Sequence, residues 1–218
     1  MGLLIFLLII GLFFPILWIP LILFGGLFLL FLPFKFTVDS LFNLFTIPGQ
    51  IYKIATNPDL RKNHALEHAT VNILEKEFGY KNLAGYATEN GFYIIGVNNT
   101  LEVTTAAKRG LDLMIKGNSQ LAIHNKCGTS LIAANFISAI IFLILLLYLG
   151  YFSIMSMVIA ILLSHLVGPF LGRMVQKNFT TTSEVKEINI VSSHIESGDY
   201  WKQPSKVFVK TEKIPYIN

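Results

Sequence analysis

Apolar residues are concentrated in two long blocks of the chain. Neither residues 1–34 nor residues 127–172 contain a single Lys, Arg, Asp or Glu. Uncharged apolar stretches well beyond about 18 residues are typical of membrane-spanning helices. All charged residues lie in 35–126 and 173–218, so the pattern predicts two membrane regions that alternate with two polar regions.

The N-terminal block is too long for one straight crossing of a bilayer. As a single helix it would extend roughly 51 Å, against a hydrocarbon core of about 30 Å. Pro15, Pro20 and Gly25-Gly26 are places where such a helix can break. We therefore expect residues 1–34 to form a hairpin or a kinked re-entrant segment. It lacks a basic start and a small-residue cleavage site, so we expect it to be retained.

The second block divides into two apolar runs, 132–149 and 154–171, separated by four residues that suit a turn. We expect a transmembrane hairpin over 129–172. Because a hairpin returns the chain to the side it left, all 17 Lys and Arg residues fall on one side. The positive-inside rule makes that side cytoplasmic, which predicts a multi-pass protein of the cell membrane with its soluble parts in the cytoplasm.

The polar regions alternate between helix and strand patterns. Asn57-Pro58 is a helix start and Gly79 a helix end, and Asn90-Gly91 between β-forming residues indicates a hairpin. Residues 36–55, interrupted at Pro48-Gly49, are expected to lie along the membrane surface. The other expected elements are helices over 59–78 and 100–116, a short strand or extended run over 121–124, and strands over 187–192 and 206–211.

The predicted fold class is thus an α+β membrane protein. Transmembrane hairpins at 1–34 and 129–172 flank a small cytoplasmic α+β domain over 35–128, and a cytoplasmic tail with short strands follows over 173–218. Composition agrees: hydrophobic residues make up 53% and charged residues 14%, with a mean hydropathy of +0.60, whereas soluble domains carry about 25% charged residues. The net charge of +4 is the basic excess expected beside anionic lipid rather than a sign of nucleic-acid binding.

The most informative motif is His64-Ala65-Leu66-Glu67-His68 within the first polar helix. Residues four apart share a helix face, so both imidazoles can reach one cation. Glu67 can sit beside the metal and accept a proton from water without being a ligand. Leu66, Ala69 and Ile73 fall on the opposite side and are expected to form the packing face. The H-x-x-E-H order is one of the known metallopeptidase signatures.

A second cluster places His124 and Cys127 three residues apart, just before the second apolar block. Catalytic zinc typically has three protein ligands and an open position, so either residue can complete the set begun by His64 and His68. Each also has a plain structural explanation, as an interfacial histidine and as a small buried cysteine. Because Cys127 is the only cysteine, an intramolecular disulfide is excluded.

Three motifs in order, His64-x-x-Glu67-His68, His124-x-x-Cys127-Gly128-Thr129-Ser130 and Gln176-x-x-x-Thr180-Thr181, resemble an uncharacterised family of prokaryotic membrane proteins. That family is a domain of unknown function, labelled a predicted metal-dependent enzyme. The resemblance covers about residues 60–190 and implies that the histidines, Glu67 and Cys127 act together. This sequence departs from the family pattern at Asn125-Lys126. The resemblance implies no substrate.

The leading functional hypothesis is a membrane-embedded hydrolase dependent on Zn²⁺ or another divalent metal. Its metal ligands are drawn from His64, His68, His124 and Cys127, and Glu67 is the catalytic base. A peptide bond is the most plausible target, met at the cytoplasmic membrane surface, with membrane lipid and a membrane-protein or peptide substrate as partners. Two alternatives stay open: a non-catalytic scaffold or assembly factor with a structural metal, and a thiol enzyme using Cys127 with His124 as its base.

Overall fold

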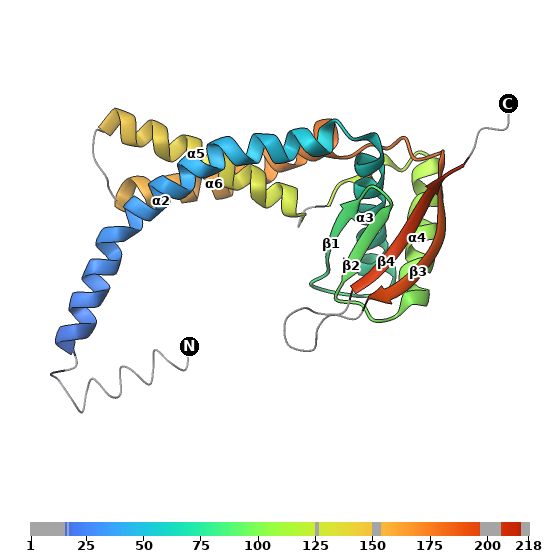
Figure 1. Ribbon diagram of the computed structural model, residues 1–218, viewed down its shortest axis with the longest axis horizontal. Coiled ribbons are helices and arrows are strands. Elements are labelled where there is room, and N and C mark those ends of the chain that lie inside the picture. The colour runs from blue at the N-terminus through green and yellow to red at the C-terminus, as the bar shows by residue number, and fades with distance from the viewer. Residues whose placement is uncertain (1–15, 17, 125–126, 150–153, 197–205, 215–218) are drawn as a thin grey trace.

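The computed structural model describes residues 16, 18–124, 127–149, 154–196 and 206–214. A long helical arm is joined to an α+β domain (Figure 1). The arm consists of α2 (Trp18–Ala55), α5 (Gly128–Leu149) and α6 (Ile154–Val175). The domain contains α3 (Pro58–Glu77), β1 (Ala84–Thr88), β2 (Gly91–Ile95), α4 (Thr100–Ile115), the 3-10 turn η2 (Ser119–Ala122), the π-helical turn η3 (Gln176–Thr180), β3 (Ile188–Glu196) and β4 (Lys206–Lys213).

The four strands form one antiparallel sheet in the order β1-β2-β4-β3. The β1–β2 hairpin turns through Glu89-Asn90, with Thr88 opposite Gly91, so the hairpin predicted from Asn90-Gly91 is confirmed. β3 and β4 come from the C-terminal tail, and β4 pairs with β2. The tail is therefore not a separate unit, because it completes a sheet begun before the last two arm helices.

Helix α3 lies under the sheet and carries the H-x-x-E-H motif. The Asn57 side chain caps its start by accepting a hydrogen bond from the Leu60 amide at 3.1 Å. Gly79 follows its end with φ +75°, as the sequence predicted. The helix packs closely on α4, because a Cβ placed on Gly110 would lie 3.0 Å from the Cβ of Ala69. The core of the domain fills the space between α3, α4 and the sheet, with Leu66, Leu74, Phe92, Ile94, Val103 and Val207 fully buried.

Two expectations about this domain were wrong. The polar side of α3 is not separate from its packing surface, since His64, Glu67 and His68 are all at most 6% exposed. Residues of η2, η3 and β1 cover these three side chains, so the middle of the helix, over 63–71, is buried on every side. The strand expected as one alternative for 121–124 does not form, because Leu121 and Ala122 belong to the η2 turn, and the extended backbone begins only at Ile123. There the Ala122 carbonyl meets a histidine of α3 instead of a neighbouring strand.

The N-terminal part of the arm also differs from the prediction. Helix α2 runs without interruption through Pro20, Gly25-Gly26 and Pro48-Gly49, and the expected boundary at 34/35 falls inside it. A proline within a helix removes one backbone hydrogen bond and bends the helix without having to end it, and the ribbon of α2 bends (Figure 1). The predicted break at Pro15 and the predicted turn at 150–153 lie outside the described residues.

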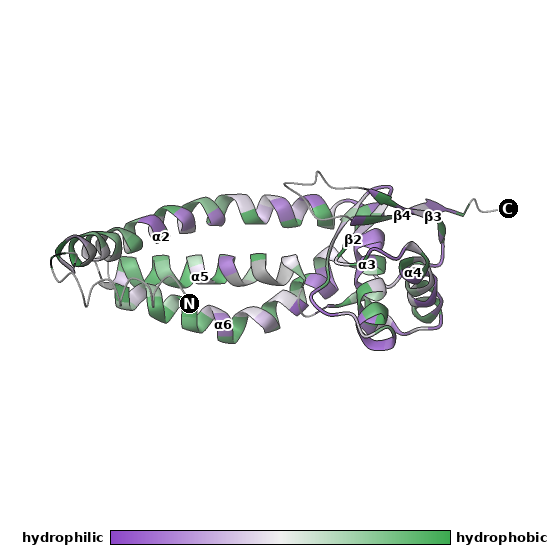
Figure 2. Cartoon of the chain, turned by 90° about the horizontal axis from the view of Figure 1, so that it is seen from below, coloured by the Kyte–Doolittle hydropathy of each residue, from purple (hydrophilic) through white to green (hydrophobic). Residues whose placement is uncertain are grey.

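The arm is apolar on its outside as well as its inside. Hydrophobic residues dominate α2, α5 and α6, while hydrophilic ones gather in the domain (Figure 2). Phe45, Leu147 and Leu166 are each more than 75% exposed. Within the part of the chain that the structure describes, one helix, over 154–180, is long and apolar enough to cross a membrane, with a mean hydropathy of 2.1, and a shorter apolar helix covers 135–148. The two-hairpin arrangement stays a prediction.

Candidate metal centre

Three of the predicted ligands converge where the arm meets the domain. His64 and His68 project from α3, and Cys127 immediately precedes α5. One ligand atom from each lies within 4.8 Å of the other two, and all three residues are buried. The Nε2 atom of His64 is 3.3 Å from the Cys127 Sγ. Ligand atoms around one tetrahedral zinc ion stand roughly 3.5 Å apart, so the group is close to the spacing that a metal ion needs.

Backbone carbonyls hold both imidazoles through the same ring nitrogen, Nδ1. The Nδ1 of His64 lies 2.9 Å from the Thr180 carbonyl oxygen, and the Nδ1 of His68 lies 2.7 Å from that of Ala122. A carbonyl oxygen only accepts, so each Nδ1 carries the proton and each Nε2 presents a lone pair. Metal-binding histidines are commonly held in this way. The Nε2 of His68 is buried and has no hydrogen-bond partner among the described residues, as expected of an atom that awaits a ligand.

The surroundings also keep the ligands in their metal-binding form. Burial lowers the pKa of His64 and lowers the pKa of His68 further, where the neighbouring imidazoles add to the effect. Both rings are therefore neutral at physiological pH, which is the protonation state that coordinates a cation.

Glu67 lies beside this group, also buried. Its Oε2 is 3.8 Å from the Nε2 of His64. Burial raises the pKa of Glu67 to about 8, because the charged form loses its hydration. The carboxylate packs against the backbone of Gly85 in β1, where an added Cβ would come within 2.6 Å of Oε1. The same Cβ would lie 2.7 Å from the Tyr93 carbonyl oxygen, which is backbone and cannot move aside, so this point of the strand requires a glycine.

The other predicted ligand, His124, has a different place. Its Nε2 lies 3.2 Å from Glu75 Oε2, and it is not part of the converging group. Its backbone is held by Gln176, whose Oε1 accepts from the His124 amide at 3.0 Å and whose Nε2 donates to the His124 carbonyl at 3.1 Å. The structure therefore places Cys127 as the third group and His124 in the supporting framework.

The third motif supplies this framework. Gln176 and Thr180 begin and end the π-helical turn η3 and are fully buried. Gln176 fixes the segment that precedes Cys127, and the Thr180 carbonyl orients His64. Single π-helical turns within helices frequently occur at functional sites. The motif pointed to these residues without indicating a role, and nothing in the sequence pointed to Gly85.

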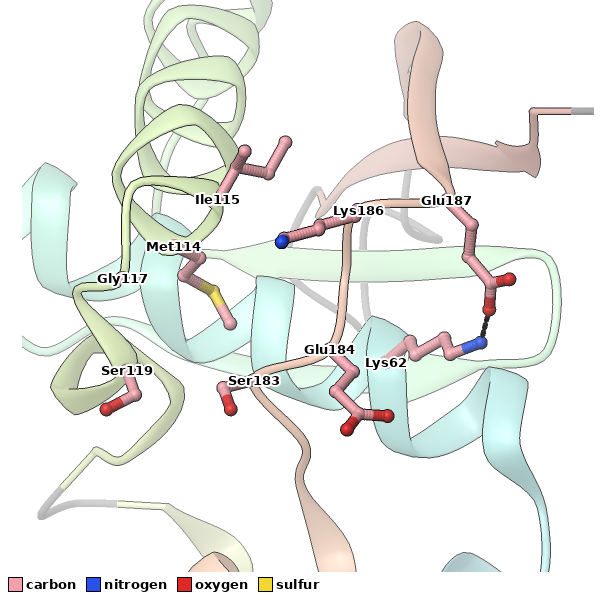
Figure 3. Close-up of a pocket in the computed structure, with 9 residues that line it drawn as sticks. All are labelled: Lys62, Met114, Ile115, Gly117, Ser119, Ser183, Glu184, Lys186 and Glu187. Carbon is pink, nitrogen blue, oxygen red and sulfur yellow. Dashed lines mark ion pairs between the residues drawn. The ribbon is translucent and has the colours of Figure 1, made fainter. Parts of the chain in front are cut away.

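A pocket of about 220 Å³ gives access to the centre. It is bounded by α3, β1, the start of α5 and the end of α2, and its lining includes His64, Glu67 and Cys127. A larger pocket of about 580 Å³ lies elsewhere on the domain (Figure 3). Its charged groups are partly neutralised by one another, since Lys62 forms an ion pair with Glu187. It has neither a histidine nor the cysteine in its lining.

The histidines left out of the predicted ligand set do not join the centre. His165 is exposed on α6, with its Nδ1 2.9 Å from the Ile161 carbonyl oxygen of the same helix. His194 is exposed on β3, where its ring contacts Phe208.

Comparison with known proteins places this arrangement in a family. A family model described as a domain of unknown function, DUF6391, matches residues 59–192, which is more than half of the chain and includes every residue of the centre. An uncharacterised protein of Picosynechococcus sp. is 33% identical over 81 residues, covering 33% of this chain and 40% of that protein. No solved structure matches the chain. The chain spans less than half of the length of this relative and belongs to the DUF6391 family.

Proposed function

We propose that the protein is a metal-dependent hydrolase that acts at a membrane surface. The observation that carries the proposal is the buried His64, His68 and Cys127 group. In it, the Nε2 of His68 is pre-oriented and has no partner among the described residues. Two imidazoles and a thiolate suit Zn²⁺, which prefers nitrogen and sulfur ligands, whereas Mg²⁺ and Ca²⁺ prefer oxygen. Three protein ligands leave a coordination position open, as in catalytic zinc sites.

A divalent ion held there would polarise a substrate carbonyl and make water more acidic. Glu67 is 3.8 Å from a ligand atom and on the wall of the pocket. The positive charge of the ion would lower the raised pKa of Glu67, so that its carboxylate would be ionised and could take a proton from that water. The water oxygen then bonds to the carbonyl carbon and the carbon–nitrogen bond of a peptide substrate breaks. Glu67 returns its proton to the leaving amine, so that water is consumed and no other reactant is needed.

The arm supports a location in the membrane. Its exposed surface is lined with large apolar side chains on α2, α5 and α6, and an isolated apolar surface of that extent requires a partner. A bilayer is the partner that suits a bundle of apolar helices. In this proposal all three helices are embedded, in a multi-pass arrangement, and the domain lies on the cytoplasmic side with the pocket at the membrane surface.

One contact favours a second candidate, a thiol enzyme. The 3.3 Å approach of His64 Nε2 to Cys127 Sγ is the spacing of a nucleophilic thiol and its base. This differs from the thiol pair that the sequence suggested, since His124 contacts Glu75 instead. The thiol candidate leaves His68 without a role, whereas the hydrolase uses all three groups.

The two candidates and the scaffold alternative are separated by one set of assays. The zinc-loaded full chain in detergent is offered a panel of fluorogenic membrane-anchored peptides and lipid esters, with and without a chelator. The hydrolase is expected to lose turnover with the chelator and regain it with zinc. A thiol enzyme would be insensitive to the chelator and inactivated by thiol alkylation.

Substituting Glu67→Gln should lower turnover by about 10²–10⁴-fold while metal content is kept. The control is Glu77→Gln, which changes a half-exposed carboxylate on the same helix and should leave turnover unchanged. In parallel, each variant is tested for complementation of a deletion strain. Full complementation by Glu67→Gln would contradict the hydrolase and favour a scaffold.

A further inference from the structure

One edge of the sheet borders the candidate centre. β1 is the outermost strand on that side, and the edge faces the helical arm (Figure 1). Tyr86 in β1 is 41% exposed, and Gly85 and Ala87 are only partly covered. All three line the same pocket as His64, Glu67 and Cys127. A strand edge that pairs with no further strand among the described residues and the ligand group therefore open into one space.

The backbone of β1 has hydrogen-bonding groups that β2 does not use. Thr88 and Gly91 are the pair that closes the two-residue turn, and such a pair is hydrogen-bonded. Hydrogen-bonded and non-hydrogen-bonded pairs alternate along an antiparallel ladder, so Tyr86 in β1 is hydrogen-bonded to Tyr93 in β2. The N–H and C=O groups of Gly85 and Ala87, in the pairs between, therefore point to the outer edge of the sheet. An edge of this kind accepts an extended polypeptide as an additional strand.

The same stretch of backbone lies against the proposed base. A Cβ added to Gly85 would come within 2.6 Å of Glu67 Oε1, so the main chain of β1 and the carboxylate are in direct contact. A strand paired with Gly85 and Ala87 would run along the pocket wall with its own peptide groups a strand spacing, about 4.8 Å, from β1. Such a strand lies between β1 and the start of α5, where Cys127 stands.

We propose that β1 binds the substrate, and that the substrate is an extended polypeptide segment that pairs with Gly85 and Ala87 and presents one of its peptide bonds beside Glu67. This rests on the proposed function and names its substrate class. Apolar side chains of such a segment would contact Ile54, Leu60 and Ile132 on the pocket wall. A lipid acyl chain has no amide groups to satisfy the free N–H and C=O groups of the strand. Lipid has a more suitable place in the almost wholly apolar pocket of about 570 Å³ between α2, α5 and α6.

The test measures binding rather than turnover, so that it can be separated from catalysis. The zinc-loaded full chain in detergent is titrated with acetohydroxamate, a small chelator that reports the metal alone, and with the peptide hydroxamate acetyl-Leu-Ala-Val-NHOH. Backbone pairing should make the peptide bind about tenfold or more tightly than acetohydroxamate. Two perturbations should remove that gain: methylation of the peptide's backbone amides, and the substitution Ala87→Pro.

Ala87→Pro removes an N–H that points away from β2, which an edge strand tolerates. Acetohydroxamate affinity and zinc content should therefore stay unchanged in this variant, which also checks its folding. The methylated peptide gives the same answer without any variant.

Binding of acetohydroxamate without a gain for the peptide, or a gain that survives both perturbations, would overturn the polypeptide proposal alone. Tighter binding of octanohydroxamate, unaffected by Ala87→Pro, would assign the pocket to acyl chains and would also overturn it. Failure of acetohydroxamate to bind would reject the metal centre itself, and the polypeptide proposal with it.

Discussion

Two pockets of the domain differ in how their polar groups are satisfied. In the larger one, about 580 Å³, Lys62 and Glu187 neutralise each other across the pocket (Figure 3). In the smaller one, about 220 Å³, Glu67 is buried with a raised pKa and lies close to the group that contains His68, whose Nε2 is buried with no partner among the residues described. Buried polar groups are normally paired. Converging ligand atoms, one of which is buried with no partner among the described residues, therefore mark the candidate site better than pocket size does.

The largest expected change in the free energy of unfolding comes from replacing Glu67 by Gln in the metal-free protein. The folded pKa of Glu67, about 8, lies above the unfolded value of 4.5, so its contribution to stability is complete below pH 4.5 and is lost as pH rises through 8. His64 and His68 change the stability in the opposite direction, since their folded pKa values are lowered. Both histidines are present in the wild type and in Glu67→Gln, so their contribution cancels when the two proteins are compared.

Between pH 5 and pH 8, the wild type should therefore lose on the order of 3 kcal/mol of unfolding free energy relative to Glu67→Gln. Thermal unfolding in detergent with a chelator, run in parallel on both proteins across this pH range, measures the difference. Parallel pH profiles would show that Glu67 ionises in the folded protein as it does in the unfolded chain.

The framework around the centre should give the next largest effect. Gln176→Ala leaves the amide and the carbonyl of His124 buried without their partner. Each such group costs at least about 1 kcal/mol, so we expect a loss of roughly 2 kcal/mol in stability and weaker zinc binding. The matched control is Gln120→Ala, an exposed glutamine in the neighbouring η2 turn. Equal unfolding temperatures and zinc affinities for the two variants would mean that the amide of Gln176 does not hold this segment.

The charged pocket should be the least sensitive. Lys62→Ala removes an ion pair that is partly exposed to water, with the Lys62 and Glu187 side chains 13% and 27% exposed. The expected loss of stability is about 1 kcal/mol or less, with zinc content unchanged. Chemical denaturation and metal analysis of the same preparation check both statements. A loss larger than that of Gln176→Ala would reverse the comparison between the two pockets.

The sequence predicted those features that depend on local pattern. Capping by Asn57, the end of α3 at Gly79 and the hairpin at Asn90-Gly91 are encoded within a few residues. The pairing of His64 with His68 follows from helical spacing alone.

Features that depend on distant segments were not predictable. The choice of Cys127 over His124 depends on Gln176 and Glu75, which lie far away in the chain. Burial of the polar side of α3 depends on strands and turns contributed by both halves of the chain. The continuity of α2 through its prolines also lies beyond local rules, because bending and breaking share one sequence signal.

The central claim is that His64, His68 and Cys127 hold a metal ion, and metal content tests it most directly. Full-length wild type, His68→Ala, Cys127→Ser and the exposed-histidine control His194→Ala are purified in detergent and equilibrated with zinc. They are then freed of excess and analysed by inductively coupled plasma mass spectrometry. The account predicts about one zinc per chain for wild type and for His194→Ala, and little or none for the other two. Wild type without metal, or His68→Ala and Cys127→Ser with as much metal as wild type, would contradict it.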